Sequence, residues 1–342
     1  MLFVSKIRVS ALLCAVGLLS MSSRGFAQVF PPFPTAIESS QFTMDQGTSA
    51  ASVPNGASGT VVMSVFASGG RFGWASTVDG KTYTNGGLES PANLPNVDCN
   101  ASTPSTCGAA IAVFNNIIYV AYADASTHGL DVGIATPISG NVAYSWTLTH
   151  TDASVQLTTS PAMSVSPDGS HLIVIYGTSS DPSTSNQFFE STLNTSGTWS
   201  QASEAGNLQS LRLSSASRPA VSLFNSKLWL CSQQNNSNHQ LFVYNSTDGI
   251  NWNFVEQFSG LALGGGAQMV TFEGNLVLAT QQNNSNRALF IFSSPDGVNW
   301  SAQEYSNIQM GGDPGLALFN GGVSLVFKAN SSGNELFGPF AN

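Results

Sequence analysis

The chain is poor in charge, above all in positive charge, and this limits the partners it can bind. Only 8% of its 342 residues are charged, with 10 Lys and Arg against 19 Asp and Glu. Binding to nucleic acid or to an anionic membrane surface needs a basic footprint. We therefore expect neither nucleic acid nor membrane lipid as a partner. Ser, Thr, Asn, Gln and Gly are abundant instead, as in exported β proteins with a neutral polar surface.

Several catalytic and structural patterns are also missing. The four histidines show no zinc-site spacing, and no Gly-rich turn joins a strand to a helix as a phosphate cradle would. No Gly-x-Ser-x-Gly turn marks a serine nucleophile. No stretch keeps a 3.6-residue apolar period, so helices are not expected. We expect no metal and no cofactor.

Long apolar runs are absent except at the N-terminus. Lys6 and Arg8 precede an apolar run over residues 9–19, and small residues end at Ala27. This pattern is typical of a secretory signal peptide, and the run is too short for a comfortable membrane span. We expect cleavage near Ala27, a flexible lead-in over 28–37 and a secreted (extracellular or periplasmic) domain over 38–342. Without Lys6, Arg8 and Arg24, 7 basic residues face 19 acidic ones, a net charge of −12.

The four cysteines suggest one disulfide. Cys99 and Cys107 bracket an irregular loop, and an oxidising compartment favours a bond between them. Cys231 lies in an apolar run and is expected to be a buried small hydrophobe.

The most informative feature present is an internal repeat. Residues 233–252 return 48 positions later as residues 281–300, both opening Gln-Gln-Asn-Asn-Ser-Asn and ending Asp-Gly-x-Asn-Trp. A fixed period of this size indicates a repeat architecture. Each module contains a short apolar strand, a turn, a buried apolar strand, a polar loop, a third strand, an Asp-Gly turn and a short outer strand. The second strands are expected at 61–66, 117–122, 172–176, 228–231, 276–279 and 323–327.

Four strands in about 50 residues, repeated six times, predict an all-β fold: a six-bladed β-propeller of four-stranded antiparallel blades. The last module stops after its third strand. The segment 38–44 precedes the first module and is expected to supply the missing outer strand, since a closed ring leaves no exposed edge.

The turns at Ser246–Trp252 and Ser294–Trp300 resemble the Asp-box (BNR repeat) of sialidase-like propellers, and Ser76–Tyr83 is a looser copy. Here Gly directly follows Asp, and the box is one residue shorter. The resemblance implies a structural role on the face away from a ligand for Asp248, Asp296, Trp252 and Trp300. Each Asp would accept backbone amides, and each Trp would pack between blades.

A sialidase would also need three arginines around one carboxylate, because a guanidinium binds it through two hydrogen bonds. After residue 27 the chain has four: Arg71, Arg212, Arg218 and Arg287. The motif that carries the first member of that triad is absent from the first module. Whether the chain is an enzyme stays open, with a non-enzyme favoured.

In a propeller, the loops between second and third strands share one face with the starts of the innermost strands, around a central channel. Amide side chains there can match sugar hydroxyls as donors and acceptors, although Asn-rich loops can also simply satisfy their own backbone. The ligand-binding candidates on this face are Arg71, His128, Arg218, Gln233, Asn235, His239, Gln281, Asn283, Arg287 and Asp313.

We therefore expect a secreted binding module for a glycan, an extracellular surface polymer or another polar ligand. The alternatives are an exo-acting sialidase-like glycoside hydrolase that uses Arg71, Arg218 and Arg287, and a non-enzymatic protein–protein scaffold.

Overall fold

A computed structural model describes most of the chain after residue 37. The described residues are 38–55, 59–99, 106–138, 143–178, 187–200, 203–204, 217–233, 239–258, 263–283, 285–330, 335–337 and 340–341. Within these ranges the regular elements are strands, and no helix is long and apolar enough to cross a membrane. The lead-in over 28–37, the candidate Asn235 and Arg212 lie outside the described residues.

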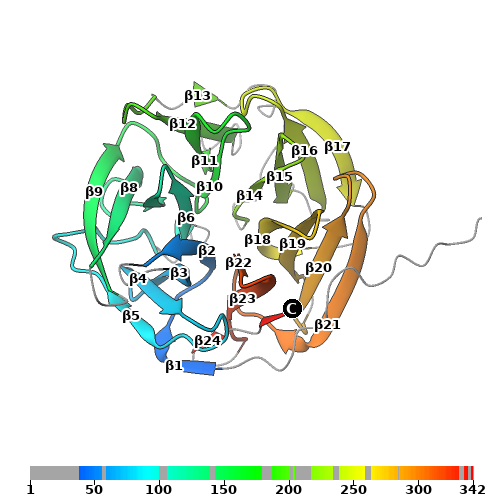
Figure 1. The fold of residues 1–342 in the computed structure, drawn as a ribbon, viewed down its shortest axis with the longest axis horizontal. Coiled ribbons are helices and arrows are strands. Elements are labelled where there is room, and N and C mark those ends of the chain that lie inside the picture. Colours follow the sequence, from blue (N-terminus) through cyan, green and yellow to red (C-terminus); the bar gives the residue numbers. More distant parts are fainter. Residues whose placement is uncertain are drawn as a thin grey trace, which may run out of the picture.

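Five sheets have four antiparallel strands each, and we number them as blades 1 to 5 (Figure 1). Blade 1 holds β2 (Thr48–Pro54), β3 (Thr60–Ser68), β4 (Arg71–Thr77) and β5 (Asn85–Leu88). Blade 2 holds β6 (Ala109–Phe114), β7 (Ile117–Ala123), β8 (Leu130–Pro137) and β9 (Tyr144–Asp152). Blade 3 holds β10 (Ala162–Val165), β11 (His171–Thr178), β12 (Gln187–Asn194) and β13 (Ser203–Glu204). Blade 4 holds β14 (Ala220–Phe224), β15 (Lys227–Gln233), β16 (Leu241–Ser246) and β17 (Asn253–Phe258). Blade 5 holds β18 (Leu263–Phe272), β19 (Asn275–Gln282), β20 (Ala288–Ser294) and β21 (Ser301–Gln309).

The sixth sheet, here called the closing sheet, differs from the blades. It has five strands: β1 (Glu38–Thr43), β24 (Glu335–Phe337), β23 (Gly322–Lys328), β22 (Gly315–Phe319) and β25 (Phe340–Ala341). The predicted count of six four-stranded blades is therefore wrong, because only five sheets have that composition. Two short segments share one edge of β23: β24 pairs with its end at Phe327, and β25 pairs with its start at Val323. β1 does pair with β24 at the outer edge, so the N-terminal segment supplies an outer strand as expected.

The innermost strands form a ring in the order β2, β6, β10, β14, β18, β22, each in contact with the next (Figure 1). The second strands fall where they were predicted and are almost fully buried, since the sheets cover both of their faces. Aromatic pairs join neighbouring blades: Phe72 of blade 1 packs on Trp146 of blade 2, with ring centroids 4.9 Å apart.

In blades 1, 4 and 5 an Asp-Gly turn joins the third strand to the fourth. Asp248 Oδ1 accepts the backbone amides of Ile250 (2.9 Å) and Asn251 (2.7 Å). Trp252 is 1% exposed and packs among Ile173 and Phe188 of blade 3. The expected structural roles of Asp248 and Trp252 are thus confirmed: the carboxylate fixes the turn and the indole fills the space between two blades.

Candidate functional site

A cavity of about 370 Å³ opens where the starts of the innermost strands converge, and we call it the central cavity. It combines strand starts with residues of the β19–β20 and β23–β24 connections, as expected for the channel face. Its walls come from blades 1, 2, 3 and 5 and the closing sheet: Gln46, Gly47, Cys107, Ser160, Gly264, Gly265, Gln281, Gln282, Asn283, Arg287, Gly311, Gly312, Asp313 and Lys328.

Glycines let the backbone close around Asp313, which lines this cavity. A Cβ on Gly265 would lie 2.6 Å from Asp313 Oδ1, and one on Gly266 would lie 2.5 Å from Oδ2. The Gly266 amide donates to Asp313 Oδ1 at 2.5 Å. Burial raises the pKa of Asp313, and the nearby charge of Arg218 opposes that rise. Asp313 is therefore held by its surroundings and has little freedom to turn toward a ligand.

Arg218 lies at the start of blade 4 and is 3% exposed. Nη1 donates to the Thr48 carbonyl at 2.7 Å, and Nη2 donates to the carbonyls of Pro314 (2.8 Å) and Ala267 (3.2 Å). These acceptors lie on or next to the innermost strands of blade 1, the closing sheet and blade 5. The guanidinium thus joins three strands to blade 4 across the channel, which is a structural task. Burial lowers its pKa, and Asp313 counteracts this.

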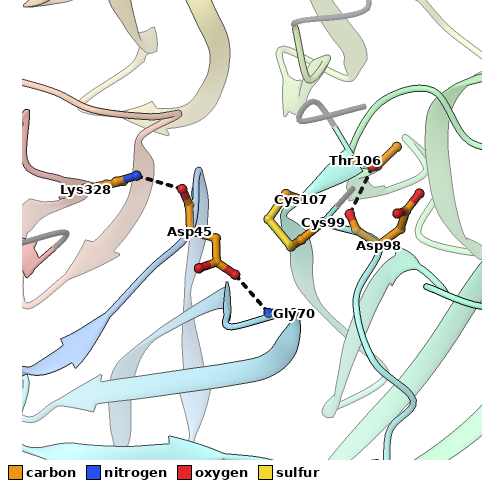
Figure 2. Close-up of a disulfide and its surroundings, with 7 residues drawn as sticks. All are labelled: Asp45, Gly70, Asp98, Cys99, Thr106, Cys107 and Lys328. Atoms are coloured by element: carbon orange, nitrogen blue, oxygen red, sulfur yellow. Dashed lines mark hydrogen bonds between the residues drawn. A yellow bond between two sulfur atoms is a disulfide. The ribbon is translucent and has the colours of Figure 1, made fainter. Parts of the chain in front are cut away.

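Two cations stand together at the rim of the central cavity. Lys328 Nζ donates to the Asp45 backbone carbonyl at 2.7 Å (Figure 2). Burial lowers the pKa of Lys328, Asp45 raises it and the positive charge of Arg287 lowers it again. The Arg287 side chain is exposed. A lysine and an arginine close enough to repel each other create a positive region in a strongly acidic protein.

The first glutamine of each repeated loop acts as a link between blades. Gln233 Nε2 donates to the Leu263 carbonyl at 2.6 Å, and Gln281 Nε2 donates to the Met310 carbonyl at 2.8 Å. Both glutamines are buried, at 2% and 4% exposure. Gln281 still lines the central cavity, next to the exposed Asn283. The amide nitrogens of both glutamines are thus already used by the fold.

A second cavity of about 580 Å³, the side cavity, lies between blades 1 and 2. His128 Nδ1 and Asp98 Oδ2 are 2.8 Å apart, with the His128 side chain 45% exposed and that of Asp98 4%. Cys99 and Cys107, the pair named from the sequence, are joined by a disulfide in its wall (Figure 2). Asp45 lies near both sulfur atoms, but the disulfide leaves no thiolate to bind a metal.

The arginines expected for a sialidase do not converge. Arg71 donates to the carbonyls of Leu88 and Glu89 beside the outer strand of blade 1. Arg218 is buried and bonds strands around the channel. Of the three arginines, Arg287 lines the central cavity and the other two do not. Neither Tyr nor Glu is among the described residues that line this cavity. The described arginines therefore form no carboxylate-binding triad.

Four of the ligand-binding candidates predicted from the sequence line the central cavity, and other residues of the two cavities were not among the candidates. Gln281, Asn283, Arg287 and Asp313 line it, whereas His239 lines neither cavity. Lys328 was not named among the ligand-binding candidates, although strand register could have added it. It faces Leu336 across its sheet as Gln281 faces Leu289 and Gln233 faces Leu241. Asp98 was also missed, because nothing in the sequence ties it to His128.

No family model and no curated protein sequence matches this chain. Several solved structures, in contrast, are similar to it. A triple arginine-to-alanine mutant of AofleA from Arthrobotrys oligospora is 13% identical with a TM-score of 0.63, over 90% of this chain and 86% of that one. Aleuria aurantia lectin in complex with α-methyl-L-fucoside is 16% identical with a TM-score of 0.55, over 84% of this chain and 90% of that one.

Trypanosoma rangeli sialidase in complex with the inhibitor DANA is 14% identical with a TM-score of 0.57, over 91% of this chain. The chain spans only 60% of the length of that sialidase. At such identities the similarity establishes the fold alone. The chain therefore has an all-β propeller fold.

Proposed function

We propose that this chain is a glycan-binding propeller whose central cavity holds a negatively charged sugar unit. The observation that carries the proposal is that Lys328 and Arg287 line one cavity. The rest of its wall consists of amides, a serine hydroxyl, glycine backbone, Cys107 and the Asp313 carboxylate, whose charge is opposed by that of Arg218. Amides and hydroxyls match sugar hydroxyls, and a carboxylate on the sugar would relieve the repulsion between the two cations.

Other features support binding over hydrolysis. Asp313 is a carboxylate in the cavity, but the Gly266 amide and the charge of Arg218 already engage it. A hydrolase would need a second group to share acid–base work with it. The scattered arginines argue against the sialidase alternative in particular. The similar structures include a fucoside complex and sialidases, so glycan binding is a known use of this fold among its neighbours.

Residues 1–37 precede the first described strand, and residues 1–27 are proposed to direct export. We expect export with cleavage near Ala27, which N-terminal sequencing of the secreted protein would test. We further propose that the Asp-Gly turns are a shortened form of the Asp-box. Their support is the shared arrangement in which Asp79, Asp248 and Asp296 each accept two backbone amides of the turn.

Titration calorimetry with acidic and neutral monosaccharides tests the proposal, with binding of an acidic sugar expected. Arg287 adopts a left-handed backbone conformation (φ 48°), which asparagine tolerates, so Arg287→Asn removes the charge and keeps the backbone. Losing one charge-assisted hydrogen bond removes about 1.5–3 kcal/mol, or roughly 10- to 150-fold in affinity. Lys328→Gln should act in the same direction.

The matched control is His239→Asn. His239 has the same backbone conformation (φ 50°) and lines neither cavity, so its replacement should leave affinity unchanged. Equal binding of acidic and neutral sugars, or full affinity after Arg287→Asn, would contradict the proposal.

A further inference from the structure

The central and side cavities are neighbours that share part of their walls. Gln46 and Cys107 line both of them. Asp45 lies at the same boundary: its side chain lines the side cavity, and its carbonyl accepts Lys328 Nζ from the rim of the central cavity (Figure 2). Each cavity falls within the usual range of about 300–1,000 Å³ for small-molecule sites. Together they make a continuous two-part surface on the channel face.

The side cavity presents one fixed imidazole. His128 Nδ1 faces the buried Asp98 carboxylate, which leaves Nε2 as the ring nitrogen available to a ligand. The backbone of His128 is fixed as well, since its amide donates to the Asp124 carbonyl at 2.8 Å and its carbonyl accepts the Leu157 amide at 2.9 Å. The His128 ring is held by the Asp98 carboxylate and by the fixed backbone of its own residue, so it is preorganised to contact a ligand.

The same backbone position recurs in three sheets and carries either of two side chains, imidazole or guanidinium. His128, His239 and Arg287 all adopt positive φ (58°, 50° and 48°) shortly before the third strand. Each carbonyl accepts an amide from the segment that leads to the next innermost strand: Leu157, Leu263 and Met310. The backbone alone would favour Gly or Asn here. The fold therefore uses the carbonyl, while the side chains differ in place: His128 lines the side cavity, Arg287 lines the central cavity and His239 lines neither.

The two cavities differ in charge. The two cations Arg287 and Lys328 outnumber the one carboxylate, Asp313, in the lining of the central cavity, whereas Asp45 and Asp98 line the side cavity beside His128. An anionic group fits the first cavity and is disfavoured in the second. Small residues such as Gly69 and Gly70 leave room in the side cavity for a bulky neutral group.

We propose that the side cavity is a second subsite, so that the ligand is an acidic oligosaccharide with its charged unit in the central cavity and a neutral unit against His128. This inference rests on the proposed function of the central cavity. His128 Nε2 and the exposed backbone of the side cavity would bind hydroxyl groups of the neutral unit. The ligand class is thus a chain of at least two sugars, only one of them charged.

Calorimetry with a matched panel tests this second subsite. The probes are glucuronate, galacturonate and N-acetylneuraminate, and the disaccharides in which each is linked to a neutral hexose. At least one disaccharide should bind about tenfold more tightly than its acid alone, the gain of about one good hydrogen bond. His128→Asn keeps the backbone conformation and should remove this gain without changing the affinity for the monosaccharide. His239→Asn should change neither.

A second measurement does not depend on any variant. Diethyl pyrocarbonate modifies exposed imidazoles, and peptide mapping by mass spectrometry reports each histidine separately. The disaccharide should protect His128, the acid alone should not, and His239 should react equally in both. A disaccharide that binds no better than its acid, or that leaves His128 reactive, would overturn the second subsite while the central site stands. If no acid in the panel binds, the proposed function fails with it.

Discussion

Replacing Arg218 should destabilise the whole propeller, because its guanidinium joins blade 4 to three other strands at the channel. Arg218→Met keeps most of the side-chain length and removes every donor. It leaves the carbonyls of Thr48, Ala267 and Pro314 without their donor and Asp313 without the charge that opposes its rise in pKa.

The size of the effect follows from these contacts. Each buried acceptor left without a partner costs about 1–3 kcal/mol, and breaking a buried charged network costs about 3–5 kcal/mol in total. We expect a loss of about 3–5 kcal/mol in the free energy of unfolding. At ~2 °C per kcal/mol for a chain of this size, the melting temperature should fall by roughly 6–10 °C. Arg218→Lys keeps one charge but cannot reach three strands, so it should lose about half as much.

Urea unfolding followed by tryptophan fluorescence measures this free energy, and a double-mutant cycle with Asp313→Asn measures the coupling. Because the two residues interact, the double variant should lose at least ~0.5 kcal/mol less than the sum of the single losses. If Arg218→Met lowered the free energy of unfolding by less than ~1 kcal/mol, the structural role of Arg218 across the channel would be refuted. Unchanged stability with lost glycan binding would instead restore Arg218 as a ligand residue.

Three further predictions concern stability. Burial, aided by the charge of Asp248, raises the pKa of Glu190 to about 7 from 4.5, so the folded state keeps this proton while the unfolded state loses it. Stability should fall as pH rises from about 4.5 to 7, and Glu190→Gln should remove that fall in urea titrations. Burial raises the pKa of Asp296, but hydrogen bonds from Asn299 and Val298 outweigh it and lower the pKa to about 2. Its contribution should be lost as pH falls from 3.8 toward 2, and be absent in Asp296→Ala. Finally, replacing Cys99 and Cys107 together by Ala removes a disulfide between residues 8 positions apart and should cost about 2–3 kcal/mol of stability, measured by calorimetry against the oxidised parent.

The strands were predictable because their determinants are local. Each second strand is a run of Val, Ile, Leu and aromatic residues between turn residues, and burial on both faces demands such a run. The Asp-Gly turns were predictable for the same reason, since the carboxylate and the amides it accepts lie within three residues of each other. Local chemistry of this kind is visible in a single sequence.

The composition of the closing sheet was not predictable, because it depends on which edge a very short strand finds. β24 has three residues and β25 has two, and both pair with β23. No apolar pattern of that length distinguishes an outer strand of a blade from a second segment on the same edge. The prediction of a sixth four-stranded blade failed at this point.

The links that Arg218 and Gln233 make between strands were not predicted from residue type. An arginine beside a channel and an amide in a polar loop both fit a ligand site. Ring closure instead brings the acceptors of Arg218 from 170, 49 and 96 residues away. Gln233 finds its acceptor 30 residues on, at the start of the next innermost strand. Side chains that link distant strands have the same composition as side chains that bind ligands, and only the three-dimensional path of the chain separates them.

The repeated loop therefore contacts the next strand through a side chain at its start and through a backbone carbonyl at its end. In blades 4 and 5, its first glutamine bonds a carbonyl of the next strand, and its last residue lends a carbonyl to the same segment. The glutamine link is made by its side chain, whereas the link of the last residue is made by its backbone carbonyl, so the same link forms with His239 and with Arg287. Blade 2 keeps the carbonyl contact with His128. One backbone position thus carries imidazole or guanidinium without any change in blade packing, and ligand contacts are most easily altered at that position.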